Sequence, residues 1–175
     1  GLTYVGLGAG ISGYLSILKD MSLVGLGLGS THITGDLSNL SGMSELEYLN
    51  LSNSLSITGD LSNLKYMSGL TYLDLSSSWS INGDLSNLKD MSGLTYIDLY
   101  NATGISGGLS DLSNLSGLTF LDLGSTQGST HITGDLSALK RLTYLSFLDL
   151  DSATGISGDL SSLSGMSELT YLDLN

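Results

Sequence analysis

Leucines recur along the chain in a fixed order, separated by polar and small residues. In segment 46–51, LEYLNL, apolar and polar positions alternate after the first two residues, which is typical of a short β-strand with one buried face. Further on, apolar residues recur every three positions, as at Leu61, Leu64 and Met67, a spacing that suits a short helical or 3₁₀ segment. Each unit is therefore predicted to hold one strand and one short helical return.

This order of residues repeats about every 24 positions. The repeats span 2–22, 23–45, 46–69, 70–93, 94–117, 118–144 and 145–168, and a bare final strand occupies 169–175. No single unit can bury its own leucines, so neighbouring units must stack and bury them jointly. The sequence predicts one solenoid domain over residues 1–175, with neighbouring parallel strands ~4.8 Å apart.

A glycine marks the turn into each return segment, and in five of the seven repeats an aspartate follows it. The glycine is predicted at a corner with a positive φ or with no room for a side chain, at Gly13, Gly35, Gly59, Gly83, Gly107, Gly134 and Gly158. The aspartates that follow are predicted to accept hydrogen bonds from the N–H groups that open the return, at Asp36, Asp60, Asp84, Asp135 and Asp159. Calcium binding is the alternative use of these carboxylates.

The motif L-x-x-L-x-L, followed by a variable loop and I-x-G-x-L, resembles the leucine-rich-repeat family over effectively the whole chain, and the second part is similar to the plant and protist type. The resemblance implies an α/β solenoid: a right-handed coil of seven repeats and a final strand, with a parallel sheet on the concave face and short helical or 3₁₀ returns. It also implies protein or glycan recognition. The family's turn asparagine is absent, and hydroxyl groups are predicted to replace it at Thr31, Ser54, Ser78 and Thr126.

Two rows of side chains are predicted on the exposed face of the strands. The aromatic row is Tyr4, Tyr48, Tyr72, Tyr96, Phe120, Phe147 and Tyr171, interrupted at Gly25, and the acidic row is Asp74, Asp98, Asp122, Asp149 and Asp173. Carboxylates about 5 Å apart disfavour each other's ionised form, so counter-cations, a basic partner or raised pKa values should compensate. The rows form a candidate ligand-binding strip, with aromatic faces for sugars, cations or apolar groups. The alternative is that they only support packing between strands.

The net charge of −12 favours a cationic or neutral ligand and disfavours nucleic acid and anionic lipid. Cysteine is absent, so disulfides and cysteine-type zinc sites are excluded. His32 and His131 lie four coils apart, ~19 Å, too far to share a metal or a proton. No stretch is apolar enough to enter a membrane. We therefore expect a non-enzymatic binding or adhesion module without cofactor or metal, extracellular or at the cell surface.

Other features support further hypotheses. Four N-x-S/T sequons are glycosylation candidates, at Asn39, Asn50, Asn101 and Asn114, and Asn39 and Asn114 are predicted at one exposed position of the return. A row of Thr3, Thr71, Thr95, Thr119 and Thr170 is a weaker indication of ice binding. Trp79 and Leu55, in the variable loop, are predicted either to form a lateral contact patch or to fold over the edge of the core. An insertion over Gln127–Thr130 is predicted to protrude as a loop on the same side.

Both ends of the predicted stack leave apolar side chains without a neighbouring coil. These are Leu2, Val5 and Leu7 at the start, and Leu169, Leu172 and Leu174 at the end. Unpaired strand edges are templates for further pairing, so the alternative function is a structural protomer that associates head to tail into a fibre or surface layer. Flanking caps or further repeats outside this sequence are the other explanation.

Overall fold

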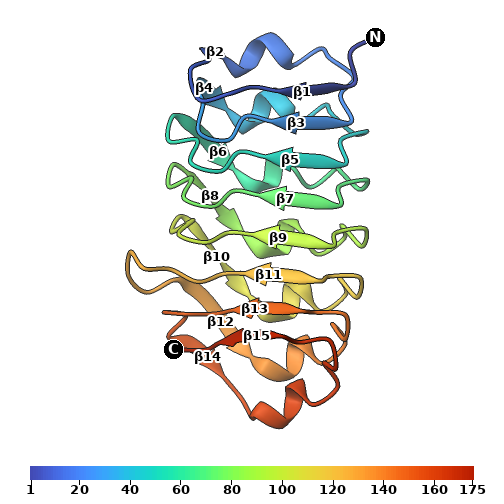
Figure 1. The fold of residues 1–175 in the computed structure, drawn as a ribbon, viewed down its shortest axis with the longest axis vertical. Coiled ribbons are helices and arrows are strands. Elements are labelled where there is room, and N and C mark those ends of the chain that lie inside the picture. The colour runs from blue at the N-terminus through green and yellow to red at the C-terminus, as the bar shows by residue number, and fades with distance from the viewer.

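The computed structural model describes residues 1–175 as a stack of coils, each crossing the same two sheets (Figure 1). Eight parallel strands form the sheet that we call the front sheet, and their order in the sheet is their order in the chain. They are β1 (Tyr4–Gly6), β3 (Gly25–Gly27), β5 (Tyr48–Asn50), β7 (Tyr72–Asp74), β9 (Tyr96–Asp98), β11 (Phe120–Asp122), β13 (Phe147–Asp149) and β15 (Tyr171–Asp173). This is the sheet that the L-x-x-L-x-L motif predicts.

A second sheet of seven parallel strands, here the back sheet, was not expected from the sequence. Its strands are β2 (Ser12–Tyr14), β4 (His32–Asp36), β6 (Ile57–Asp60), β8 (Ile81–Asp84), β10 (Ile105–Gly108), β12 (His131–Asp135) and β14 (Gly155–Ser157). In six of the seven coils the back strand contains the corner glycine, and in the last coil Gly158 directly follows β14. The glycine takes a positive φ in every coil, between +113° and +154°, so that prediction is confirmed.

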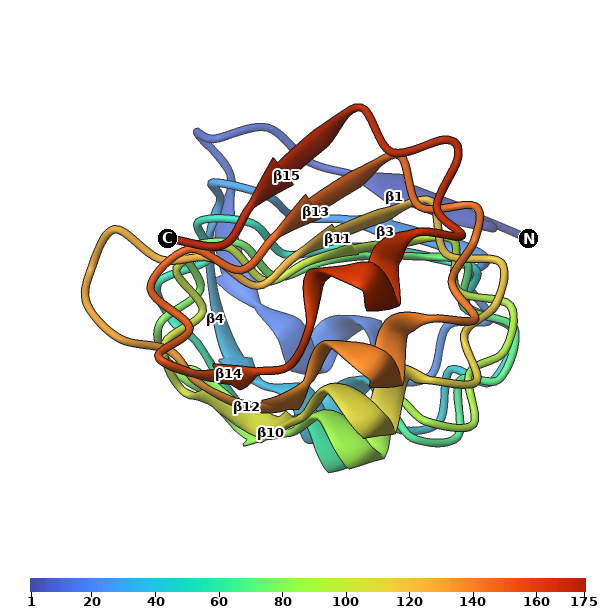
Figure 2. The same ribbon diagram turned by 90° about the horizontal axis from the view of Figure 1, so that it is seen from below.

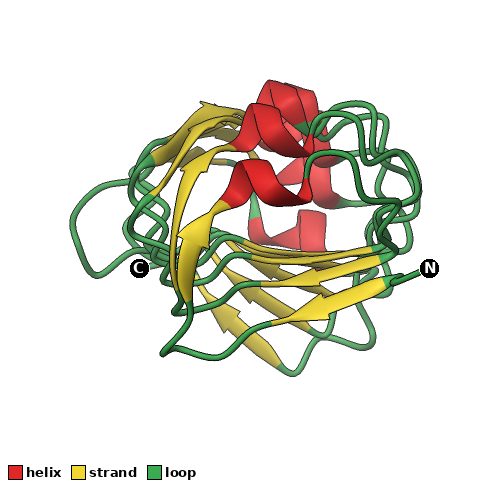
Figure 3. Ribbon diagram, turned by 90° about the horizontal axis from the view of Figure 1, so that it is seen from above, coloured by secondary structure: helices red, strands yellow, loops and turns green.

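Seven 3₁₀ helices follow the back strands and complete each coil, as expected. They are η1 (Leu15–Leu18), η2 (Leu37–Leu40), η3 (Leu61–Asn63), η4 (Leu85–Asn87), η5 (Leu109–Leu112), η6 (Leu136–Leu139) and η7 (Leu160–Leu163). Viewed along the stack, the front strands lie on one side, with the back strands and the helices opposite (Figures 2 and 3). Between them, 44 buried apolar side chains form one continuous core.

The corner glycine is required because successive coils approach closely there. At Gly59, which has φ +115°, a Cβ atom would lie 2.9 Å from the backbone nitrogen of Leu37 in the preceding coil. A side chain would therefore clash with backbone that cannot move aside, in addition to the strain of the positive φ. In β6, Ile57 is the only residue with a buried hydrophobic side chain. The close approach of successive coils nevertheless lets this short strand pair with β4.

The predicted aspartate caps are confirmed in five coils. Asp36, Asp60, Asp84, Asp135 and Asp159 each accept a hydrogen bond from the backbone N–H two residues later, at 2.7–2.9 Å. Coil five has Gly108 at this position, and there Asp111 accepts from the Gly108 N–H instead, at 3.1 Å. The carboxylates are thus used within the fold, as capping predicts.

These caps give a first prediction. Asp84→Ala should lower the free energy of unfolding at pH 7 by about 1 kcal/mol, because the N–H of Ser86 loses its acceptor. Hydrogen bonds from Ser86 hold the pKa of Asp84 below its ordinary 3.8, so this stabilisation is present above that pH and is lost as the pH falls below it. Urea unfolding at pH 7 and pH 3 should show the difference shrinking in acid. Asp84→Asn keeps an acceptor and is the control.

The strand-to-loop turn confirms the hydroxyl prediction in three coils and corrects it in the fourth. Thr31 and Ser54 donate to the carbonyl of Leu28, and Ser78 donates to that of Leu51, at 2.6–3.2 Å. In coil six the buried hydroxyl is that of Ser125, whereas Thr126 is exposed. The longer loop of this coil shifts the turn by one residue, so the alignment of the repeats placed it wrongly.

Five of the six apolar side chains proposed for an end-to-end contact are at least partly exposed. Leu2 is 63% exposed, and Leu172 and Leu174 are 41% and 40% exposed. Leu7 and Leu169 are half-buried, and Val5 is buried against the second coil. Val5 is therefore not available for an end-to-end contact, which corrects its inclusion among the candidates. For the other five residues, the head-to-tail contact stays a prediction.

Candidate functional site

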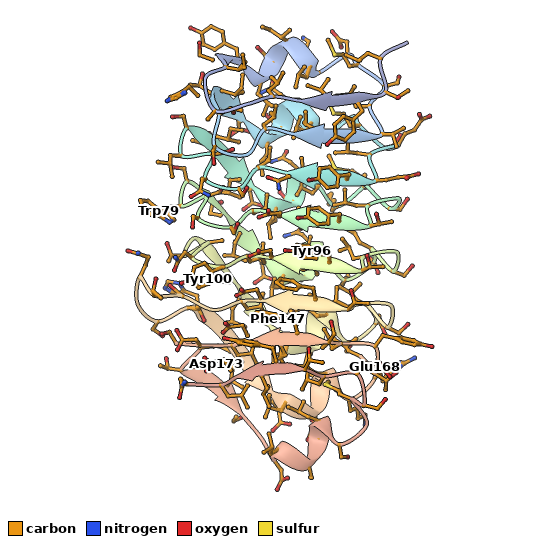
Figure 4. All side chains as sticks on the ribbon, in the orientation of Figure 1. Trp79, Tyr96, Tyr100, Phe147, Glu168 and Asp173 are labelled. Atoms are coloured by element: carbon orange, nitrogen blue, oxygen red, sulfur yellow. The ribbon has the colours of Figure 1, made fainter.

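The aromatic row forms a continuous stack on the front sheet. Strand pairing aligns Tyr48 with Tyr72, Tyr72 with Tyr96, and Phe120 with Phe147. From Tyr48 to Tyr171, neighbouring ring centroids are 4.2–4.5 Å apart and their planes differ by 4–18°. We call these six rings the aromatic ladder, and Figure 4 labels Tyr96 and Phe147 within it. Each stacked pair contributes roughly 0.5–1.5 kcal/mol beyond its burial.

Gly25 interrupts the ladder but does not leave a gap. The ring of Tyr4 lies where a side chain on Gly25 would stand, since a Cβ there would overlap the Tyr4 ring. Tyr4 therefore leans toward Tyr48, with ring centroids 6.1 Å apart and planes tilted by 39°. Because residue 25 is a glycine, the rings of Tyr4 and Tyr48 can approach each other although the strand between them carries no ring.

Stacking determines which parts of the rings a ligand can reach. The faces of the internal rings contact each other, so their edges and tyrosine hydroxyls are what the front sheet presents to solvent. The rings are half-buried, apart from Tyr171, which is 42% exposed. The flat faces expected for sugar rings are thus occupied by neighbouring residues, and the ladder suits a ligand that lies across ring edges.

The acidic row runs beside the ladder, and each member closes a turn of its own coil. Oδ1 of each aspartate accepts from the backbone N–H two residues later at 2.8–3.1 Å, for Asp74, Asp98, Asp122, Asp149 and Asp173. Asn50 does the same in the third coil, and its Nδ2 donates to Oδ2 of Asp74 at 2.9 Å. We call the aromatic ladder with these five aspartates the Tyr/Asp strip.

Burial and mutual repulsion change the ionisation of these carboxyl groups. Burial raises the pKa of Asp122 to about 7, with Asp98 and Asp149 adding to the effect through their charges. Burial also raises the pKa of Asp98 and of Asp149. Of the three compensations that the sequence predicts, raised pKa values are the one that the structure shows. Near neutral pH, Asp122 in the middle of the row is therefore only partly ionised.

The aspartates lie on successive strands and do not converge. No three residues among the histidines, aspartates and glutamates of the structure are grouped closely enough to hold a metal ion. The threonine row on the same sheet is also used internally: hydroxyl groups donate to carbonyls of the preceding coil at 2.9–3.1 Å, from Thr71, Thr95, Thr119, Ser146 and Thr170. This row reinforces the sheet and has few free donors for ordering water.

Known structures share this architecture. The internalin InlF of Listeria monocytogenes is 21% identical with a TM-score of 0.60, over 91% of this chain and 50% of its own. The plant peptide hormone receptor RGFR1, solved in complex with RGF2, is 22% identical with a TM-score of 0.70, over 94% and 26%. A leucine-rich-repeat protein of Leptospira interrogans is 16% identical with a TM-score of 0.56, over 99% and 49%.

The chain has the leucine-rich-repeat fold. The fold expected from the motif is thereby confirmed, including the parallel strands and the 3₁₀ returns. No protein-family model and no curated protein sequence matches the chain. The chain spans half or less of the length of these three structures. The helices of this leucine-rich-repeat stack are all short, and none could span a membrane.

The leucine-rich-repeat coil places the four sequons in different surroundings. Asn101 is buried, and Asn50 is half-buried with its amide nitrogen donating to Asp74. Asn39 lies within η2 and donates to the carbonyl of Asp36, whereas Asn114 follows η5 and is exposed. The expectation that Asn39 and Asn114 share one position is therefore wrong. Only Asn114 is exposed.

We predict that Asn114 is the glycosylated sequon when the chain is secreted from glycosylating cells. Its side chain makes no hydrogen bond that a glycan would disrupt, unlike that of Asn39. Peptide mass spectrometry should find the glycan at Asn114, and Asn114→Gln should remove most of the mass shift. Glycan at Asn50 alone would contradict the prediction and would place sugar on the Tyr/Asp strip.

Proposed function

We propose that this chain is a non-enzymatic recognition module, extracellular or at the cell surface, and that it binds a protein or peptide of cationic character along the Tyr/Asp strip. The observation that carries the proposal is the strip itself. Six rings present their edges in one unbroken line beside five carboxyl groups, on a sheet whose strands are all fixed by pairing. A surface held this firmly loses little entropy when a ligand binds.

Charge favours a cationic partner. The chain carries a net charge of −12, which accelerates encounter with basic partners and opposes acidic ones. A cationic side chain over the strip would stabilise the ionised form of Asp98 and Asp122, whose pKa values are raised in the free protein. Binding should therefore release protons and strengthen as the pH rises through about 7.

Similar folds support a peptide or protein ligand over a small molecule. RGFR1 is a peptide hormone receptor and was solved with RGF2, and a plant receptor-kinase ectodomain that is 20% identical was solved with Casparian strip integrity factor 2. An extended peptide crossing parallel strands would contact several ring edges at once. We propose that the ligand of the Tyr/Asp strip binds in this way.

Peptide selection tests the proposal directly. A random dodecapeptide library is selected on the immobilised protein at pH 8 in low salt, and enriched peptides are measured by titration calorimetry. We expect enrichment of lysine, arginine and apolar residues, 1:1 binding with a Kd on the order of 1 µM, and weaker binding at pH 6. Enrichment of acidic peptides, or the absence of any enriched peptide, would refute the proposal of a cationic ligand.

A further inference from the structure

A second candidate surface lies on the side of the stack, away from the Tyr/Asp strip. Here the variable loops of coils four to six form a groove of about 420 Å³, open to solvent. Its lining is Trp79, Thr103, Gln127, Gly128, Ser129 and His131. Figure 4 shows Trp79 at the edge of the molecule, on the side from which the coil-six loop protrudes.

Trp79 forms one wall of the groove. It is the only tryptophan of the chain and is 52% exposed. No other aromatic ring stacks on it, unlike the rings of the aromatic ladder. The exposed part of this large side chain has no apolar contacts in the free protein, so covering it with a ligand would remove more apolar surface from water. Its indole is therefore available for a ligand that packs against an aromatic ring.

The opposite wall is the insertion found only in coil six, and it is held at both ends. At its start, Oδ1 of Asn101 accepts from the Thr126 N–H at 2.8 Å and from the Ser125 hydroxyl at 3.1 Å. At its end, the hydroxyls of Ser129 and Thr154 are hydrogen-bonded at 2.7 Å. The side chain of Gln127 is exposed between these anchors. The loop is thus preorganised, which reduces the entropy lost on binding.

The side chain of His131 has no hydrogen-bonded partner, in contrast to that of its counterpart His32. The string GSTHITGDLS occurs twice, and in the first copy Nδ1 of His32 is hydrogen-bonded to the carbonyl of Ala9 at 2.8 Å. In the second copy the side chain of His131 makes no hydrogen bond within the protein and lines the groove. The same local sequence therefore provides a tethered ring in coil two and a free one in coil six.

We propose that this groove binds a neutral sugar unit of a glycan. Its lining combines one aromatic ring with hydroxyl, amide and imidazole groups, and it contains no aspartate, glutamate, lysine or arginine. A pyranose ring presents C–H groups on its faces, which pack on the electron-rich face of an indole, and hydroxyls at its rim, which hydrogen-bond to neutral polar groups. Trp79 and the insertion are two coils apart, about 10 Å, which leaves room for one such ring.

Trp79 also supplies the measurement, because all tryptophan emission comes from this groove. The protein is titrated with methyl glycosides of glucose, galactose, mannose and N-acetylglucosamine up to about 50 mM, well above the Kd of order 1 mM typical of weak sites. We expect a saturable change in emission with at least one of them. No saturable change with any of the four would overturn the proposal.

Matched variants locate the response. Gln127→Ala and His131→Ala should each weaken the binding at least fivefold, whereas His32→Ala, in the tethered copy of the same string, should leave it unchanged. Equal effects of His131→Ala and His32→Ala would also overturn the proposal. The sugar response is independent of the proposed peptide site, so it should persist in Glu47→Lys, a substitution on the front sheet beside Tyr48.

Discussion

Leu73→Ala is expected to lower the free energy of unfolding by about 2–5 kcal/mol, and Leu121→Ala by a similar amount. Both leucines are fully buried, Leu73 in β7 and Leu121 in β11, in the middle of the stack. Truncation removes apolar contact area and leaves a cavity that the fixed strands on either side cannot close. Urea-induced unfolding, followed by circular dichroism, measures the loss.

An exposed leucine is the matched control for this prediction. Leu55 is 54% exposed in a variable loop, so Leu55→Ala should change the free energy of unfolding by no more than about 0.5 kcal/mol. A near-zero loss for Leu73→Ala and Leu121→Ala would mean that the leucine positions of the front strands do not face the core.

Asp122→Asn is expected to stabilise the protein at pH 8, which is unusual for a substitution at a buried polar position. The asparagine Oδ1 can accept from the Gly124 N–H as the aspartate does. Its Nδ2 can donate to a neighbouring carboxyl group, as that of Asn50 does to Asp74 at 2.9 Å. The substitution thus keeps the turn and removes a charge that burial and two neighbouring aspartates disfavour.

The raised pKa of Asp122 determines how the effect of this substitution on stability depends on pH. The folded protein holds the proton of Asp122 up to a pKa of about 7, against 3.8 ordinarily. Stability from this group is therefore complete below pH 3.8 and is lost as the pH rises to about 7. A shift of one pKa unit corresponds to about 1.36 kcal/mol of stability when the charge is not screened. Because solvent partly screens this site, we expect Asp122→Asn to raise the free energy of unfolding at pH 8 by less than the whole shift implies, roughly 1–3 kcal/mol. At pH 4 the gain should nearly vanish.

Asp135→Asn is the control, since hydrogen bonds from Ser137 lower the pKa of Asp135. The same chemical change there should bring no stabilisation at pH 8, in denaturant unfolding measured at low salt. A loss of stability for Asp122→Asn at pH 8 would show that a specific contact, absent from this structure, neutralises the carboxylate.

The leucine pattern was enough to predict the front sheet, the returns and the capping aspartates, because each depends on contacts within one coil or on strict repetition. The back sheet was missed because its strands are short and the corner glycine breaks the alternation by which strands are recognised. In β6 only Ile57 has a buried side chain, and the pairing depends on the close approach at Gly59. A close approach between the backbones of two coils produces no periodic pattern of hydrophobic residues in the sequence.

The Tyr/Asp strip was predictable in composition but not in geometry. Spacing placed Tyr72 beside Tyr96, yet ring orientation depends on side-chain rotamers that spacing does not fix. The rings turn face to face, which leaves their edges for a ligand. The sequence predicts only part of the lateral groove. It places Trp79 and the insertion on the same side of the stack, whereas the free ring of His131 is apparent only from the structure, by comparison with His32.

The two candidate sites differ in the ligand chemistry they favour. On the front sheet the aromatic faces are occupied and carboxyl groups are near, which favours a cationic peptide. In the lateral groove one indole is free and the surroundings are neutral, which favours a sugar. A glycoprotein could engage both surfaces, because they lie on adjoining sides of the same coils (Figure 4).

Charge reversal at two nearby glutamates tests the central claim, that the front sheet binds a cationic peptide. Glu47 directly precedes Tyr48 at the start of β5, whereas Glu45 lies in the turn before it, and both are exposed. Glu47→Lys and Glu45→Lys change the net charge equally, so long-range attraction is matched. For a library-selected peptide, we predict that Glu47→Lys raises the Kd at least tenfold and Glu45→Lys less than threefold, by titration calorimetry at pH 8. Equal changes in the two variants, or none in Glu47→Lys, would contradict the claim.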